Sequence, residues 1–206
     1  KQGDKGFEKD EGETVITGKS KEHTVTIDTS KGDVDVTFDD LKIDVSGKKE
    51  GDGSGDSPVR ESKAAVTVKG DHDAAIELDG DNELKSGGYK AGLEKNGDES
   101  SGKLTIKDDK GKDGSLTAEG GDGGAGIGGG KESTGSNITI RGGTIEAVGG
   151  SNAAGIGDGA GPWSEPDPDT PPSNPSNPNN IIICGDAEVT AKAGSQMTDA
   201  KAPAIG

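Results

Sequence analysis

A four-residue unit, Ala-Gly-Ile-Gly, recurs along this chain and constrains the fold more than any other feature of the sequence. It occurs at Ala125–Gly128 and Ala154–Gly157, and the related Ala-Ile-Gly stands at Ala204–Gly206. Two short segments precede each copy, for example Asn137–Ile140 and Gly143–Ala147 before the second one. A three-part unit that returns after about 29 residues falls within the range of solenoid repeats.

The apolar residues are few, but they alternate within short segments. With 26% hydrophobic residues, 38 glycines and a net charge of -16, composition alone would indicate disorder. Alternation such as that of Leu104 and Ile106 instead turns one side of a strand inward, and stacked copies can share one interior. The predicted interior is a column of Val36, Phe38, Val66, Val68, Ile76, Leu78, Leu104, Ile106, Ile138, Ile140 and Ile182, with Leu93, Ile127, Ile156 and Ile205 on another wall.

These patterns predict an all-β fold, a right-handed parallel β-helix (solenoid) with about three short strands per coil. We expect residues 1–33 to form an N-terminal cap or partial first coil and residues 34–206 to form the β-helix domain. The proline-rich stretch 162–180 is expected to be a loop insertion at one corner. A β-sandwich would also show short alternating strands, but it would not explain a unit that recurs at the same place in each repeat.

The acidic balance excludes two classes of partner. A formal charge of -16 repels nucleic acid and anionic membrane surfaces, whereas it suits neutral sugars and divalent cations. No apolar run reaches the roughly 18 residues that cross a bilayer, so no membrane insertion is expected. Cys184, the single cysteine, follows three isoleucines and is predicted to be a small buried hydrophobe.

The run from Val34 to Gly130, with VTFDDLKID, AAIELDGDNEL, KAGLE and GSLTAEGGDGGAGIGGG, resembles the carbohydrate-binding β-helix proteins of clostridial and other cellulolytic Firmicutes. The segment ITIRGGTIEAVGGSNAAGIG, residues 138–157, is similar to repeats in large anchored surface proteins of such bacteria. The resemblance implies a right-handed parallel β-helix, related in shape to pectate lyases, that binds plant polysaccharides of the cellulose or pectin type and carries calcium ions. It also implies a secreted or cell-surface location.

Acidic pairs at predicted corners are the candidate calcium ligands. Asp71 and Asp73 form one pair and Asp79 and Asp81 form the next, with Asp33, Asp35, Asp39 and Asp40 one coil earlier. Calcium takes six to eight oxygen ligands, and stacked corners could bring two such pairs within reach of one ion. The alternative is that these residues are solvated turn formers, because Asp-Gly and Gly-Asp favour turns.

Two aromatic residues are candidates for stacking on a sugar ring. Tyr89 lies in the turn Gly87–Lys90, and Trp163 lies in the proline-rich stretch. An equally open reading of Trp163 is that its ring pins its own loop to the coil.

No catalytic pattern stands out. His23 and His72 are isolated, so neither a Ser-His-Asp arrangement nor a metal-spaced histidine pair is indicated. The sequence therefore favours a non-catalytic polysaccharide-binding or adhesin domain, a monomer within a larger surface protein. The alternatives are a polysaccharide lyase-like enzyme that acts on acidic glycans and a passive surface stalk.

Overall fold

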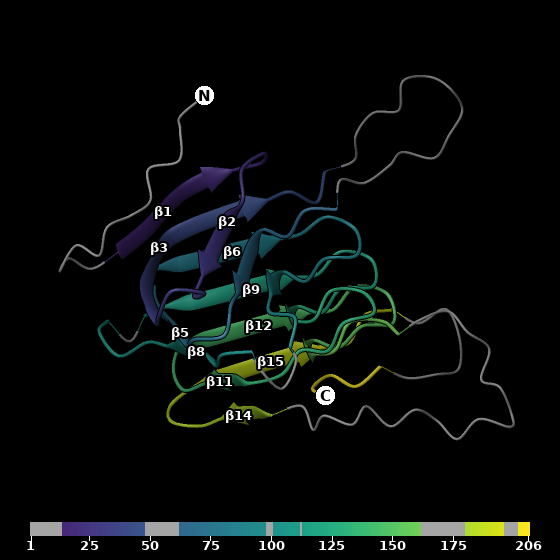
Figure 1. Ribbon diagram of the computed structural model, residues 1–206. Helices are drawn as coiled ribbons and strands as arrows, with labels where there is room; N and C mark the ends of the chain where they lie inside the picture. Colours follow the sequence, from purple (N-terminus) through teal and green to yellow (C-terminus); the bar gives the residue numbers. More distant parts are fainter. Residues whose placement is uncertain (1–13, 48–61, 98–100, 112, 162–179, 196–201) are drawn as a thin grey trace, which may run out of the picture.

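The computed structural model describes residues 14–47, 62–97, 101–111, 113–161, 180–195 and 202–206. In this part of the chain there are fifteen β-strands and no helix, and every strand pairing is parallel (Figure 1). It follows that these residues hold no helix long and apolar enough to cross a membrane. The predicted all-β class is confirmed.

The strands form three stacks, which we call the first, second and third sets. The first set contains the beginning of β3 (Val34–Asp44), then β5 (Ala74–Asp79), β8 (Leu104–Lys107), β11 (Ile138–Ile140) and β14 (Ile181–Ile183). The second set contains the end of β3, then β6 (Asp81–Lys85), β9 (Ser115–Glu119), β12 (Thr144–Val148) and β15 (Glu188–Lys192). The third set contains β2 (Val25–Asp28), β4 (Val66–Lys69), β7 (Leu93–Glu94), β10 (Ile127–Gly128) and β13 (Ile156–Gly157).

Each strand pairs with the strand one repeat away, not with its neighbour in sequence. Because β3 is long enough to take part in two sets, the first and second sets share one ten-stranded sheet. In the same sheet β1 (Thr14–Ser20) pairs with β3 along most of its length, from Val36 to Ile43. The third set is a separate five-stranded sheet. In Figure 1 the second set runs from purple β3 to yellow β15 in chain order. This order is consistent with a parallel β-solenoid.

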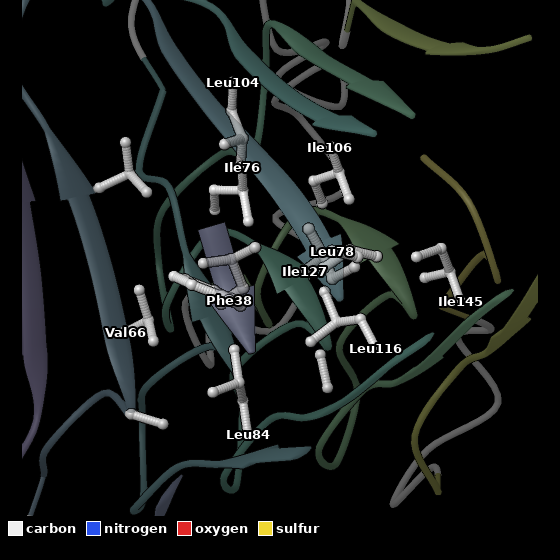
Figure 2. Packing of buried hydrophobic residues seen from close by; sticks show 14 of the residues in the cluster. Phe38, Val66, Ile76, Leu78, Leu84, Leu104, Ile106, Leu116, Ile127 and Ile145 are labelled. Atoms are coloured by element: carbon white, nitrogen blue, oxygen red, sulfur yellow. The ribbon is translucent and has the colours of Figure 1, made fainter. Parts of the chain in front are cut away.

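The repeated register explains the shared interior. Ile127 pairs with Leu93 on one side and with Ile156 on the other, and all three side chains are fully buried. Figure 2 shows side chains from all three sets, among them Ile76, Leu116 and Ile127, in one cluster. The core therefore holds few residues from each repeat and depends on the repeats lying over one another.

Three interior assignments from the sequence are wrong, and a fourth residue, Ile205, lies on its predicted wall but is exposed. Val66 and Val68 belong to β4, so they lie on the wall of Leu93 and not in the column of Val36. Ile182 pairs with Thr139 and is 46% exposed, because the flanking isoleucines take the inward positions. Ile205, bridged to Ile156 at the end of the third set, is 44% exposed because no further strand of the described chain covers it.

Cys184 is also exposed, which contradicts its predicted burial. It follows the last strand of the first set, where its backbone N–H donates to Ile140 but no described strand lies beyond it.

Close stacking dictates the glycines of the Ala-Gly-Ile-Gly unit. A Cβ on Gly126 would lie 2.5 Å from the backbone nitrogen of Val148, and a Cβ on Gly157 would lie 1.6 Å from the carbonyl oxygen of Gly206. Real Cβ atoms do not approach other atoms so closely, and Gly157 also has a positive φ of 124°. The unit recurs because the same corner is built again in each repeat.

One polar side chain stands inside the second set. Asn82 is 2% exposed and lies between Leu41 and Leu116 in the stack. Its Oδ1 accepts the Leu41 N–H at 2.9 Å, and its Nδ2 donates to the carbonyls of Asp79 and Ser115, each at 3.1 Å. These hydrogen bonds join three successive repeats where the chain turns from the first set to the second.

The predicted division at residue 33 stays a prediction. The described N-terminal strands β1 and β2 lie against β3 and β4 respectively. Of the predicted insertion 162–180, only Asn180 is among the described residues.

Candidate functional site

A polar groove follows the corners at which the chain leaves the second set. Its volume is about 720 Å³. The lining residues come from several successive repeats: Ser46, Ser62, Ser86, Gly88, Tyr89, Glu119, Gly120, Gly121, Asp122, Val148, Gly149, Gly150, Ser151 and Ser195. Because adjacent strands lie about 4.8 Å apart, a groove that crosses four or five repeats is roughly 15–20 Å long.

The groove is open because the corner residues of these repeats are glycines, which have no side chain. A Cβ on Gly121 would lie 1.8 Å from the carbonyl oxygen of Gly87, and a Cβ on Gly150 would lie 1.8 Å from that of Gly121. A Cβ on Gly194 would likewise lie 1.8 Å from the carbonyl oxygen of Gly150. Only glycine allows the backbones to approach this closely, and the absence of side chains leaves an open floor.

In each of three repeats the chain leaves the groove floor through a tight turn. The third residue of each turn has a left-handed backbone conformation, with positive φ. The turns are closed by hydrogen bonds from Lys90 N to Gly87 O, from Gly124 N to Gly121 O and from Ala153 N to Gly150 O. The third residues are Tyr89 with φ 67°, Gly123 with φ 77° and Asn152 with φ 58°. Glycine and asparagine tolerate this conformation, but for a tyrosine it costs roughly 1–2 kcal/mol.

Tyr89 is the large side chain at the rim of the groove. It is 52% exposed, so hydrophobic burial does not offset the cost of its backbone conformation. The Nζ of Lys131 lies 4.9 Å from the ring centroid, a cation–π contact that fixes one side of the ring. The exposure of Tyr89 agrees with its place in a glycine-flanked turn, and its part in sugar binding stays a prediction.

Behind the turn, a buried carboxylate anchors the neighbouring lysine. Glu94 is 3% exposed, and its Oε1 accepts a hydrogen bond from Lys90 Nζ at 3.1 Å. Its Oε2 is buried without a hydrogen-bond donor among the described residues. Lys90, Glu94 and Lys131 surround the Tyr89 turn with charge, and no periodic pattern in the sequence marks any of the three.

The groove wall carries hydroxyl and carboxylate groups. Glu119 faces Lys85 at 3.7 Å, and the hydrogen bond from Lys85 to Glu83 raises the pKa of that lysine. At the N-terminal end the Ser46 hydroxyl donates to Asp44 at 2.5 Å and lowers the pKa of that carboxyl. Such a surface can hydrogen-bond the hydroxyls of a neutral ligand.

The four predicted calcium ligands occupy two separate corners. Asp73 directly precedes β5 and Asp79 is its last residue, so a strand of six residues, about 20 Å, separates the pairs. Each corner instead stacks on an acidic residue one coil earlier, Asp73 on Asp33 and Asp81 on Asp40, and calcium binding there stays a prediction. No cluster of three or more acidic, histidine or cysteine side chains suited to a metal occurs in the described part of the chain.

The stacking of acidic corners that the sequence predicted is present, and these carboxylates bind backbone and side-chain groups of adjacent repeats. Asp33 Oδ1 accepts the Asp73 N–H at 3.1 Å, and Asp73 Oδ1 accepts the Lys103 N–H at 2.8 Å. At the other corner Asp81 donates its N–H to a carboxylate of the preceding repeat and accepts the Ser115 hydroxyl at 2.9 Å. Asp71 contacts His72 at 3.0 Å.

Trp163 lies outside the described residues. A second, smaller hollow of about 280 Å³ lies at the N-terminal end, where Lys19, Lys21 and Lys42 face Asp44 and Glu83. It has no aromatic side chain in its lining.

The glycine pairs after the second strand of each repeat are the signal that sequence reasoning missed. The equivalent glycines are Gly87, Gly121 and Gly150, each two residues after the end of its strand, and aligning them places Tyr89 opposite Gly123 and Asn152. No family model, curated protein or solved structure matches this chain.

Proposed function

We propose that this chain is a non-catalytic polysaccharide-binding or adhesin domain of a secreted or cell-surface protein, built as a right-handed parallel β-helix. Tyr89 at the rim of the groove is the observation that carries the proposal. Tyr89 is 52% exposed and has a left-handed backbone conformation, which lowers the stability of the fold. The two equivalent turns place glycine and asparagine at this position, and these residues adopt the conformation more easily. Backbone strain of this kind is characteristic of binding sites.

The shape and chemistry of the groove favour a chain of sugars over a compact ligand. A floor without side chains, roughly 15–20 Å long, accommodates an extended oligomer lying along the stack. The Tyr89 ring offers an apolar face to a sugar ring, and serine hydroxyls with Glu119 and Asp122 offer hydrogen-bond partners to sugar hydroxyls. The net charge of -16 supports a neutral glycan over an acidic one unless cations bridge the two.

A glycan array with and without calcium tests the proposal, followed by titration of the best ligand. Tyr89→Asn places in this turn the residue that Asn152 supplies in a sister turn, so the turn is kept while the ring is lost. We expect about a tenfold loss of affinity from the lost ring contact. Tyr89→Phe, which keeps the ring face, should bind nearly as the parent does.

The alternatives give different results. If the parent chain binds no glycan under either condition, the proposal is wrong and the passive surface stalk is favoured. Release of unsaturated products from polygalacturonate would show lyase chemistry and contradict a non-catalytic role. Glycan binding that requires calcium would support the predicted calcium cofactor. Glycan binding that is unchanged in the presence of a chelator would show that calcium takes no part in it.

A further inference from the structure

The last repeat leaves its inward side chains open on one side. In the preceding repeat Ile140, Ile145 and Ile156 are at most 1% exposed. The residues stacked on the first and last of these, Ile183 and Ile205, are 40% and 44% exposed. The apolar interior thus continues to the end of the described stack without a cover from the described residues.

The far edge of β15 also has unused backbone groups. Glu188 donates its N–H to Gly143 O, and Lys192 accepts the Gly149 N–H, both toward the preceding repeat. Because residues of a parallel ladder point alternately to either neighbour, the N–H and C=O groups of Val189 and Ala191 point to the other side. No described strand pairs with that side of β15.

The sequence of β15 is complementary to itself in the antiparallel direction. If two copies pair about a two-fold axis through Thr190, Val189 of one copy lies opposite Ala191 of the other, and all four residues exchange hydrogen bonds through the groups that are unused. Glu188 then lies opposite Lys192, twice by symmetry, and this lysine, whose Nζ pairs with Glu146 at 2.5 Å within one copy, meets a second carboxylate across the interface. Val189 and Ala191 both face the core, so the two interiors join in register.

We propose that two copies of this chain associate end to end through β15, antiparallel and centred on Thr190. The two-fold axis that pairs β15 with itself exchanges the first and third sets, so Ile183 of one copy covers Ile205 of the other. This goes beyond the glycan-binding role and differs from the monomer expected from the sequence. A dimer would present two Tyr89 grooves at a fixed separation.

Sedimentation equilibrium over a wide concentration range tests the pairing. The parent chain should be a dimer. Glu188→Lys and Lys192→Glu should each weaken self-association by about tenfold, because each places like charges opposite one another at two symmetric positions. An equimolar mixture of the two variants restores both opposite-charge pairs and should recover a dimer of parental strength.

A proline variant tests the hydrogen bonds. Ala191→Pro removes an N–H that a single copy does not use, at an edge position where proline is tolerated, and should give a folded monomer. Circular dichroism at a concentration where all variants are monomeric verifies that each remains folded.

Three results would overturn the proposal. The first is a parent chain that stays monomeric at millimolar concentration. The second is a mixture of Glu188→Lys and Lys192→Glu that associates no better than either alone. The third is a monomer in which the Val189 and Ala191 amides exchange slowly with solvent, which would assign the edge to another part of the same chain.

Discussion

Gly121→Ala should destabilise the fold strongly although it adds a single methyl group. The new Cβ would lie 1.8 Å from the carbonyl oxygen of Gly87, about 1.6 Å inside ordinary van der Waals contact. Moving the repeats apart would strain the hydrogen bond from Gly121 N to Lys90 O and that from Tyr89 N to Asp122 O. Two weakened backbone hydrogen bonds and the overpacking together cost roughly 2–5 kcal/mol.

Two matched glycines control for the effect of the methyl group itself. A Cβ on Gly47 would meet nothing within 4 Å, so Gly47→Ala should change the free energy of unfolding by less than about 0.5 kcal/mol. A Cβ on Gly194 would lie 1.8 Å from the carbonyl oxygen of Gly150, but Gly194 lies in the last described repeat, where no described strand pairs with the far side of β15. At concentrations where the chain is monomeric, its replacement by alanine should therefore cost less than that of Gly121.

Urea unfolding of the three variants, followed by circular dichroism, measures these differences. In thermal unfolding of a chain of this length, each kcal/mol corresponds to about 2–4 °C in Tm. The Gly121→Ala variant should therefore have a Tm at least several degrees below that of the parent. Equal stability of the Gly121→Ala and Gly47→Ala variants would refute the close stacking of these corners.

Three further predictions follow from buried or hydrogen-bonded polar groups. Asn82→Ala should lower the free energy of unfolding by about 2–4 kcal/mol in urea titrations, because buried backbone groups of three repeats lose their partner, whereas Glu83→Ala, which removes a half-buried side chain that pairs with Lys85 at the surface, should cost less than about 1 kcal/mol. The lowered pKa of Asp44 means that its contribution to stability is present above its unfolded value of about 4 and is lost as pH falls through the folded value; Ser46→Ala should shrink this acid-dependent loss, and thermal melts from pH 7 to pH 2 that match the parent would contradict it. Glu77→Ala should cost about 2–3 kcal/mol and speed hydrogen exchange at the two loop amides that donate to its Oε1, while Glu77→Gln, which keeps an acceptor, should cost less.

The sequence was sufficient to predict the strands and their parallel stacking because alternation and recurrence are both visible in it. Leu104 and Ile106 alternate, and the register of the repeats follows from the recurring Ala-Gly-Ile-Gly unit. It could not decide which wall Val66 belongs to, since alternation distinguishes inside from outside but not one inner wall from another. Three consecutive isoleucines carry no alternation at all, so the outward position of Ile182 was set only by its partner Thr139.

The candidate site was predictable to a similar extent. Exposure of Tyr89 follows from its glycine-flanked turn, but its left-handed backbone is a property of the stacked corner that only an alignment of the repeats reveals. The acidic residues were correctly placed at stacked corners, but their carboxylates accept hydrogen bonds from backbone N–H groups of adjacent repeats, and no local sequence pattern specifies these bonds. Lys131 and Glu94 approach the turn from other parts of the chain, and no local pattern marks them.

The constant register between repeats also bears on how such a chain changes its length. Ala118 pairs with Ala147, and Ala147 pairs with Ala191, so a repeat that is duplicated or removed as a whole presents familiar partners to its neighbours above and below. An insertion of one residue within a strand would instead reverse inward and outward positions for the rest of that strand. Related chains of this fold should therefore differ by whole repeats, each of which lengthens the groove by one strand spacing.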